Sequence, residues 1–244
     1  MKKAFVTGAS KGIGLAIAKK LLTEGVEVVG TYNSTNKEQI ENLLADNSGL
    51  EMIQVNLADR VQTQNLLEQL KDEHFNYIVN NAGNFEEDDL ENFNLKVWDD
   101  IIAVHMTAPY MIVSAMHKNM QSGDAIVNVA STDQETGAYT SFAYSAAKTG
   151  LTSLTKSMAN RLGPKNIRVN AVSLGWIETP MTEGGIPKEA NEMVPLGRSA
   201  QPEEVANVVS FLLSEDAAYV NGSIVIVDGG LNNTDYLLKK EAGL

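Results

Sequence analysis

The chain begins with a short apolar run, a glycine-rich loop and a helical pattern, in that order. The run covers residues 2–6, the loop is Thr7-Gly8-Ala9-Ser10-Lys11-Gly12-Ile13-Gly14, and the stretch IGLAIAKKLL has helical spacing. Glycines let the backbone come close to a diphosphate, and the N–H groups and dipole of a helix start attract its charge. Because the strand before and the helix after are both present, the loop predicts a dinucleotide site rather than a merely tight turn.

Short β-branched runs alternate with amphipathic stretches along the rest of the chain. Several runs are apolar at nearly every position, which is typical of parallel strands covered on both faces. The stretches between them carry apolar residues at three- and four-residue spacing, as helices do. The predicted strands cover residues 2–6, 26–30, 50–55, 76–80, 125–130, 167–173 and 223–228. This order predicts the α/β Rossmann fold, a doubly wound, seven-stranded parallel sheet with helices on both faces.

No linker, low-complexity tract or repeat divides the chain, so we expect residues 1–244 to form a single domain. The stretch from about 174 to 200 interrupts the alternation, since it contains Pro180, Pro187 and Pro195 and has no clear period. A long irregular segment in a compact domain is usually a lid or a binding loop. We therefore predict that these residues cover a substrate.

Charge and composition exclude several classes of protein. The 31 Asp and Glu residues outnumber the 19 Lys and Arg residues and give a net charge of −12, which argues against binding to nucleic-acid phosphates. Without cysteine, the chain has no disulfide, no thiolate metal ligand and no cysteine nucleophile. No apolar run approaches the roughly 18 residues of a membrane span. We expect a cytoplasmic protein that binds neither nucleic acid nor membrane.

The residues after the second predicted strand bear on the choice of dinucleotide. An acid about 20 residues past the glycines would bond the adenosine ribose of NAD. This chain has Thr31, Tyr32, Asn33 and Ser34 at that place. No carboxylate there repels a 2′-phosphate, and Lys11, with Lys37 as a second candidate, can attract one. The sequence therefore favours NADP(H) over NAD(H), the alternative being that Lys11 is only a solvated loop lysine.

A serine, a tyrosine and a lysine form a second chemical signal. Ser131 follows the run AIVNVA, and Tyr144 and Lys148 lie about one helical turn apart, so they share a helix face. An ammonium beside a phenol lowers the pKa of the phenol, which is about 10 when unperturbed. The tyrosine then becomes a usable acid or base close to neutral pH. Tyr236 and Lys240 repeat the spacing, but no strand-end serine precedes them, so we interpret that pair as incidental.

Taken together, these motifs closely resemble the short-chain dehydrogenase/reductase family. The resemblance covers nearly the whole chain, from the glycine loop through Asn80-Asn81-Ala82-Gly83 and the residues of the second signal to VNGSIVIVDGG. It implies that Tyr144 is the general acid/base, that Ser131 holds the substrate oxygen, and that Lys148 bonds the nicotinamide ribose while lowering the pKa of the tyrosine.

The resemblance also implies a set of cofactor contacts. The diphosphate would lie against the glycine loop and the adenine beside residues 56 and 57, while residues 177 and 179 would lie near the nicotinamide carboxamide and the diphosphate. Residues 81–83 would support the central strands and the cofactor. The full set of cofactor-binding candidates is Gly8, Ser10, Lys11, Gly12, Ile13, Gly14, Asn33, Ser34, Asn56, Leu57, Asn81, Ala82, Gly83, Tyr144, Lys148, Ile177 and Thr179.

Two positions depart from the family pattern. His105 stands where the family has a catalytic Asn that anchors a water leading to the lysine. A histidine can also bond a water, but its charge can change near neutral pH. We treat His105 as a candidate catalytic residue, and a histidine that simply fills a helix position is the alternative. Leu174-Gly175 replaces the usual Pro-Gly, which removes a rigid φ and is expected to loosen the substrate loop.

The reaction expected from these residues is hydride transfer between nicotinamide and a carbonyl or alcohol carbon. Tyr144 exchanges the proton on oxygen, and Ser131 donates a hydrogen bond to the charge that develops there. No metal is required. The substrate would lie beneath residues 176–195, where Trp176, Met181 and Met193 offer apolar contact or else pack in the core.

Substrate identity stays open. The organisation is most similar to that of 3-oxoacyl-carrier-protein reductases and of related sugar or small-alcohol dehydrogenases. An acidic carrier protein needs a basic docking patch, whereas the run FEEDDLENF (85–93) is acidic. Arg161, Lys165 and Arg168 are candidates for such a patch, so the carrier-protein substrate remains an alternative. A second alternative, motivated only by His105, is a non-catalytic NADP-sensing protein.

Members of the family commonly assemble as tetramers through the helices that follow the fourth and fifth strands and through the C-terminal strand region. The two helices here, at about 99–118 and 142–162, carry wide apolar faces that one sheet surface does not cover. We therefore expect a homotetramer. The apolar residues of these faces are Ile101, Ile102, Met106, Met111, Ile112, Leu151, Leu154 and Met158.

Overall fold

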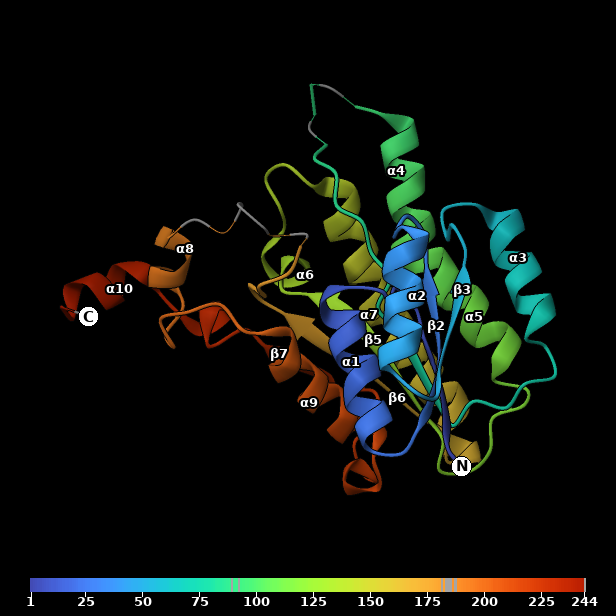
Figure 1. Cartoon of the computed structure of the whole chain (residues 1–244). Coiled ribbons are helices and arrows are strands. Elements are labelled where there is room, and N and C mark those ends of the chain that lie inside the picture. Colours follow the sequence, from blue (N-terminus) through green and yellow to red (C-terminus); the bar gives the residue numbers. More distant parts are fainter. Residues whose placement is uncertain (89, 92, 181, 183–185, 187, 244) are drawn as a thin grey trace.

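The computed structural model describes residues 1–88, 90–91, 93–180, 182, 186 and 188–243. Its strands form a seven-stranded sheet in the order β3-β2-β1-β4-β5-β6-β7, in which every neighbouring pair is parallel (Figure 1). The strands are β1 (Lys3–Val6), β2 (Glu27–Tyr32), β3 (Leu50–Gln54), β4 (Tyr77–Asn80), β5 (Ala125–Ser131), β6 (Arg168–Leu174) and β7 (Ile224–Val227). The predicted doubly wound fold is confirmed, and each strand lies within two residues of its predicted ends.

Helices cover both faces of the sheet. One apolar cluster joins the sheet to α1, α2 and α9, and a second joins its other face to α3, α5 and α7 (Figure 1). Two short helices, α8 and α10, lie side by side away from the sheet, where Lys239 Nζ donates a hydrogen bond of 2.6 Å to the carbonyl of Glu192. The helices are α1 (Gly12–Thr23), α2 (Lys37–Asp46), α3 (Arg60–Gln69), α4 (Leu95–Ile102), α5 (Ala108–Met116), α6 (Asp133–Thr136), α7 (Phe142–Leu162), α8 (Lys188–Met193), α9 (Pro202–Leu213) and α10 (Tyr236–Glu241).

The helix predicted at 99–118 is not a single regular helix. A π-helical turn at Ala103–Thr107 separates α4 from α5. Pro109 lies at the start of α5, and it lacks the N–H that would bond the carbonyl four residues back, at His105. The turn therefore widens at His105. By contrast, α7 begins and ends at the predicted residues 142 and 162.

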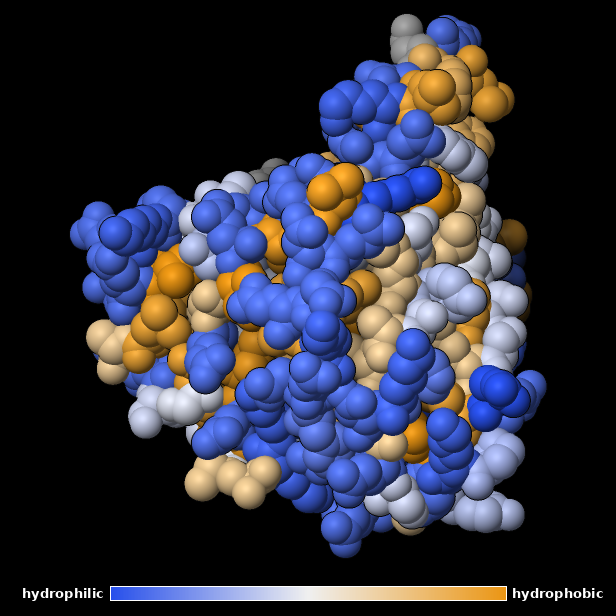
Figure 2. All heavy atoms as spheres, turned by 90° about the vertical axis from the view of Figure 1, so that its right-hand side faces the viewer, coloured by the Kyte–Doolittle hydropathy of each residue, from blue (hydrophilic) through white to orange (hydrophobic). Residues whose placement is uncertain are grey.

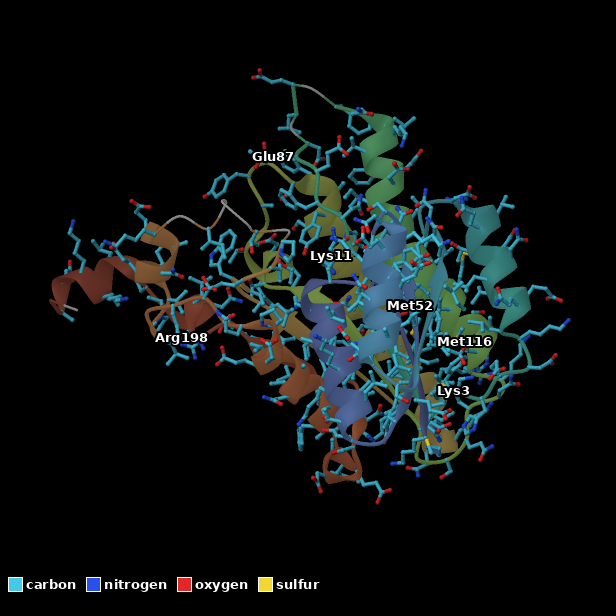
Figure 3. The ribbon with its side chains drawn as sticks, viewed as in Figure 1. Lys3, Lys11, Met52, Glu87, Met116 and Arg198 are labelled. Carbon is cyan, nitrogen blue, oxygen red and sulfur yellow. The ribbon has the colours of Figure 1, made fainter. Side chains whose placement is uncertain are left out.

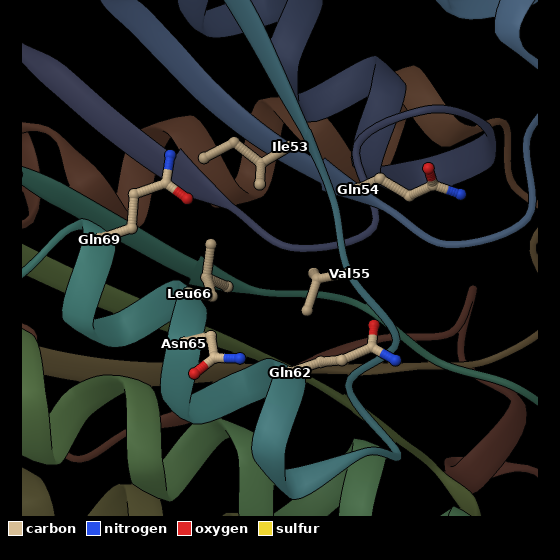
Figure 4. Close-up of a pocket in the computed structure, with 7 residues that line it drawn as sticks. All are labelled: Ile53, Gln54, Val55, Gln62, Asn65, Leu66 and Gln69. Atoms are coloured by element: carbon tan, nitrogen blue, oxygen red, sulfur yellow. The ribbon is translucent and has the colours of Figure 1, made fainter.

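The parallel strands bring all their carboxyl ends to one edge of the sheet, where the predicted site residues lie. In Figure 3, Lys11 and Glu87 lie toward this edge, while Lys3 marks the opposite edge. A pocket of about 180 Å³ lies between β3 and α3, and Ile53, Gln54, Gln62 and Leu66 are among the residues that line it (Figure 4). Within the described residues, no helix is long and apolar enough to cross a membrane.

Candidate active site

The glycine loop has the geometry that a bound diphosphate requires. Gly8 and Gly12 have φ of +68° and +55°, a region that favours glycine. A Cβ at Gly14 would lie 2.1 Å from the Gly8 carbonyl oxygen, so only glycine fits. Lys11 precedes α1 without capping it through its side chain, and the first turn holds no acid. The first N–H groups of α1 are therefore left for an anion.

The segment after β4 holds the glycine loop in place. The side-chain amide of Asn81 donates hydrogen bonds to the carbonyls of Thr7 at 2.9 Å and Gly8 at 3.2 Å. The backbone N–H groups of Asn81 and Ala82 both donate to the Thr7 hydroxyl at 2.9 Å. Asn81 and Ala82 therefore support the loop, and Thr7, which the sequence analysis did not single out, is the acceptor that joins them.

The loop also contacts the segment that follows β2. The Ser10 and Thr35 hydroxyls lie 2.7 Å apart, and Gln54 donates a hydrogen bond of 3.0 Å to the carbonyl of Asn33. Asn33, Ser34 and Lys11 are exposed. Two neutral side chains and a lysine therefore border the region where a ribose phosphate is expected, and no carboxylate occurs from residue 31 to 36.

The remaining cofactor candidates lie at the same edge of the sheet. Asn56 follows β3, and its side-chain oxygen accepts a hydrogen bond of 3.0 Å from the N–H of Ala58. Leu57 is buried beside it. The segment that carries Ile177 and Thr179 begins after β6, where the backbone of Trp176 and Glu178 bonds Ala200 and closes the base of the predicted substrate loop.

Thr179 lies against the glycine loop. A Cβ placed on Gly12 would be 3.5 Å from the Thr179 Cβ, which is ordinary contact distance. The structure thus brings together the glycine loop and a residue more than 160 positions later, as the resemblance implied.

The predicted trio of Ser131, Tyr144 and Lys148 lies where β5 meets α7. Ser131 is the last residue of β5, and the other two lie in the first turns of α7. Lys148 is buried, and its ammonium donates a hydrogen bond of 2.7 Å to the carbonyl of Val129. Its Nζ lies 5.4 Å from the centre of the Tyr144 ring. The sheet therefore fixes the lysine close to the phenol.

The prediction that the pKa of Tyr144 is lowered is wrong for this structure, in which it is raised. Burial raises the pKa of Tyr144 to about 12; the Asp133 charge raises it further, and hydrogen bonding by Ser131 opposes the rise. Burial also lowers the pKa of Lys148 to about 7, against the Asp133 charge. The spacing of two residues on a helix face indicates proximity, but both groups lose water here, and loss of water favours their neutral forms.

Asp133 is a site residue that the sequence analysis missed. It begins α6, two positions after Ser131, and burial raises the pKa of its carboxyl while the Lys148 charge lowers it. The only sequence signal was its place two positions after the strand-end serine. Its charge acts on both Tyr144 and Lys148.

His105 lies inside the site. It is buried, its Nε2 lies 2.8 Å from the carbonyl oxygen of Asn84 and 3.2 Å from the N–H of that residue, and its ring meets the edge of the Tyr144 ring. Within the described residues, Nδ1 has no hydrogen-bond partner. Burial, and then the Lys148 charge, hold the pKa of His105 well below 6.5.

Apolar side chains surround the tyrosine. The rings of Phe85 and Tyr144 meet edge to face, with centres 5.6 Å apart. Trp176 and Met193 are 40 % and 43 % exposed, so these two are not core residues. Met181 lies outside the described residues. Phe85 belongs to the run 85–93, whose apolar members the sequence analysis left unassigned.

The acidic run 85–93 is only partly a charged rim. Asp88 is buried, and its carboxylate accepts a hydrogen bond of 3.2 Å from the N–H of Ala143 at the start of α7. A carboxylate at this end of a helix is favourable. Leu90 and Phe93 are exposed, and Figure 2 shows hydrophobic side chains on the projection that carries α4.

The basic patch expected from three residues does not form as predicted. Arg168 is buried and donates hydrogen bonds to the carbonyls of Leu212, Leu213 and Ser214 at the end of α9. It begins β6, at the opposite edge of the sheet from Ser131. The guanidinium is therefore used within the fold, because the last carbonyls of a helix need donors.

Comparison with known proteins places these features in context. Residues 8–232 match the family model described as Enoyl-(Acyl carrier protein) reductase. The 3-oxoacyl-[acyl-carrier-protein] reductase FabG of Aquifex aeolicus is 35 % identical over 240 residues, covering 94 % of this chain and 97 % of that protein. The same enzyme from Thermotoga maritima is 36 % identical over 244 residues, covering 94 % of this chain and 97 % of that protein.

Two solved structures are similar over nearly the whole chain. One is a short chain dehydrogenase from Burkholderia cenocepacia in complex with NADP, with a TM-score of 0.89 and 29 % identity; the match covers 95 % of this chain and 98 % of that one. The other is a blue fluorescent protein from a metagenomic library in complex with NADPH, with a TM-score of 0.87 and 31 % identity, covering 94 % of this chain and 97 % of that one.

Proposed function

The chain belongs to the short-chain dehydrogenase/reductase family of oxidoreductases, and from this premise we propose that it interconverts a small carbonyl compound and its alcohol with NADP(H), using Tyr144 as general acid/base. The observation that carries the proposal is the meeting of Ser131, Tyr144 and Lys148 at the sheet edge that also holds the glycine loop. Hydride transfer needs the reacting carbonyl carbon close to the nicotinamide, and this arrangement would bring a carbonyl at the trio close to a cofactor at the glycine loop.

The residues present fit a dinucleotide phosphate. Gly14 lets the start of α1 pack directly against the backbone of Gly8, and the first N–H groups of α1 have no side-chain cap. The lack of an acid after β2 and the exposed Lys11 support NADP(H) over NAD(H). The complexes of two structural relatives with NADP and NADPH support the same choice.

The bound nicotinamide would supply or accept the hydride, and side chains of the protein transfer the proton to or from the substrate oxygen. With its pKa raised to about 12, the Tyr144 phenol stays protonated near neutral pH and can donate its proton to a carbonyl oxygen that gains negative charge. Ser131 donates a hydrogen bond to the same oxygen. In the oxidation direction the phenol oxygen takes the proton back, for which its deprotonated form is needed.

We propose that Lys148 and His105 assist the proton transfer at Tyr144. Lys148 is held by the Val129 carbonyl close to the phenol ring, and with a pKa of about 7 its ammonium can give up a proton near neutral pH. We propose that His105 replaces the usual asparagine by accepting a hydrogen bond at Nδ1, the nitrogen without a partner among the described residues. A purely packing role for His105 is the alternative.

A second candidate function is 3-oxoacyl-carrier-protein reduction, which the two FabG relatives favour. Three observations support a free small molecule instead: the net charge of −12, exposed Glu86 and Glu87 beside the site, and a buried Arg168 that contributes no docking charge. We therefore place the carrier-protein substrate second.

We also propose one domain of residues 1–244, a homotetramer and a location in the cytoplasm. All seven strands of the described residues belong to one sheet, which supports the single domain. The expectation that the apolar faces of the two helices stay uncovered is wrong for Ile101, Ile112, Leu151 and Met158, which are buried within the chain. The support for an interface that remains is Tyr110 on α5, which the sequence analysis did not name and which is 54 % exposed. The partners that we propose are the substrate and further copies of the chain.

The experiment that tests the function is a panel of ketones, acyl thioesters and sugars assayed with NADPH and NADH at the absorbance of the reduced nicotinamide. We expect turnover of an uncharged ketone or sugar with NADPH, and a kcat at least ~10²-fold lower in Tyr144→Phe with NADPH affinity retained. Turnover confined to acyl thioesters would favour the carrier-protein function. NADPH binding with no turnover of any compound would favour the sensor.

A further inference from the structure

The backbone of Asp133 is fixed between the two proposed catalytic segments. Its N–H donates a hydrogen bond of 3.3 Å to the Ser131 hydroxyl, and its carbonyl accepts one of 2.9 Å from the hydroxyl of Ser145, the residue after Tyr144. The N–H of Gly137 also donates to this carbonyl at 2.9 Å. The side chain of Asp133 therefore starts from a fixed point between Ser131 and the first turn of α7.

The carboxylate of Asp133 is half-buried, and in the described part of the chain it has no hydrogen-bond or ion-pair partner. Other carboxylates removed from water are satisfied: Asp88 binds the start of α7, and Asp124 accepts hydrogen bonds from Asn76 and from the backbone of Gln121. A carboxylate that has lost part of its water needs donors. The carboxylate oxygens of Asp133 are therefore left to accept hydrogen bonds from a bound molecule.

The Asp133 charge acts on two groups of α7, and a third ionisable side chain packs against one of them. Tyr144 and Lys148 lie on α7, and His105 lies on the π-helical turn and presses against Tyr144. The Asp133 charge raises the pKa of both Tyr144 and Lys148, in agreement with the hydrogen bonds that hold Asp133 between Ser131 and Ser145. The lysine ammonium remains bonded to the Val129 carbonyl and forms no ion pair with Asp133.

We propose that Asp133 is a specificity-determining residue that accepts a hydrogen bond from a hydroxyl or ammonium group of the substrate, on a carbon next to the reacting one, and that rejects a carboxylate at that place. The inference rests on the proposed function, because Ser131 must hold the reacting oxygen. Because the N–H of Asp133 bonds the Ser131 hydroxyl, the carbon next to the reacting one is the part of the substrate that we propose meets the Asp133 carboxylate.

The preferred substrates are accordingly hydroxy ketones, polyols or amino alcohols rather than keto acids. A donor on the substrate replaces the water that burial removed from the carboxylate, whereas an anion there meets a like charge in a site partly removed from solvent. The donor also neutralises part of the charge that opposes ionisation of the tyrosine. Asp133 thus selects the substrate and also changes the pKa of Tyr144, the proposed acid.

The test compares four-carbon ligands of matched size: 3-hydroxybutan-2-one, butan-2-one and 2-oxobutanoate. Parent, Asp133→Asn and Glu135→Gln enzymes are assayed with NADPH for kcat/KM, and the dissociation constant is measured for every ligand that is not turned over. Glu135 is the matched control, because it is an exposed acid on the same short helix.

We expect the parent to prefer the hydroxy ketone over the keto acid, and Asp133→Asn to lower that preference by about tenfold or more, with Glu135→Gln unchanged. Asp133→Asn should also let Tyr144 form tyrosinate at a lower pH than in the parent, as followed by absorbance against Tyr144→Phe. A preference that stays within about twofold of the parent in Asp133→Asn overturns the inference.

The two proposals fail in different ways. If the parent turns over carbonyl compounds but the preference does not depend on Asp133, only the specificity inference fails. If no compound is turned over, the proposed function fails, and the dissociation constants and the tyrosinate titration still decide whether Asp133 selects for donors. Circular dichroism of Asp133→Asn confirms that the comparison is made on folded protein.

Discussion

The imidazole ring of His105 packs edge-on against the phenol ring of Tyr144, with centres 5.0 Å apart and an interplanar angle of 76°. On its other sides, the imidazole contacts Gly83 and the backbone of Asn84. The residue that departs from the family pattern therefore touches the residue proposed to carry the proton. A change at His105 is expected to be read out in the acid–base behaviour of Tyr144.

Lys11→Ala should weaken NADPH binding by about 1–2 kcal/mol and leave NADH binding nearly unchanged, because a charge-assisted contact to the 2′-phosphate is lost. Titration of both cofactors measures this. Lys19→Ala, an exposed lysine further along α1, is the matched control. Equal affinities of the parent for NADPH and NADH would contradict the assigned cofactor preference.

His105→Asn should remove an acid limb from the pH profile of activity. The imidazole is neutral at pH 6.5 and above, because burial and Lys148 lower its pKa; protonation at lower pH blocks Nδ1 as an acceptor and places a second charge near the ammonium. We expect the parent activity to fall on the acid side, at a pH below the ordinary histidine value of about 6.5, and the variant activity to be flatter there. Superimposed profiles between about pH 5 and 8 would leave His105 with packing alone.

The same substitution should change the pH dependence of stability. The unfolded chain takes up a proton at His105 below about pH 6.5, whereas the folded chain does not until its lowered pKa is reached. Because the unfolded state binds more protons in that window, the free energy of unfolding of the parent decreases as pH falls. His105→Asn should lose less stability over the same range in chemical denaturation.

Gly83→Ala should disturb the site through His105. A Cβ at Gly83 would lie 2.7 Å from the imidazole Cε1, and the ring cannot move freely because Tyr144 packs against it. We expect a loss of about 1–3 kcal/mol of stability and a lower kcat. The double variant with His105→Asn should recover part of both, since the smaller side chain leaves room. No recovery in thermal melts and kinetics would place the clash elsewhere.

Arg168→Met should destabilise the fold by about 2–4 kcal/mol, because three carbonyls at the end of α9 lose their donor in a buried place. The exposed Arg161→Ala is the control and should change stability little. Chemical denaturation distinguishes the two. A surface role for Arg168 predicts instead that both variants melt like the parent.

Light scattering at micromolar concentration should give the mass of a tetramer. Tyr110→Glu, which places a charge on the exposed side of α5, should shift the population toward smaller species. Phe211→Glu makes the matched change at an exposed aromatic residue of α9, on the other face of the sheet, and should leave the mass unchanged. A monomeric parent rules the interface out.

The sequence by itself determined the layout of the protein. Parallel strands buried on both faces need continuous apolar runs, and amphipathic helices need three- and four-residue spacing, so local patterns located the strands and both ends of α7. Because parallel strands end at one edge, the order of the motifs also placed Ser131, Tyr144 and the glycine loop together.

Only the tertiary structure decided what these groups experience. The pKa of Tyr144 depends on water removed by distant segments and on the Asp133 charge, and no local spacing reports either. Asp88 and Arg168 looked like surface charges in the sequence, yet each binds the end of a helix formed by residues far along the chain. Charge and burial act through space, so their effects appear only once the chain has brought these groups together.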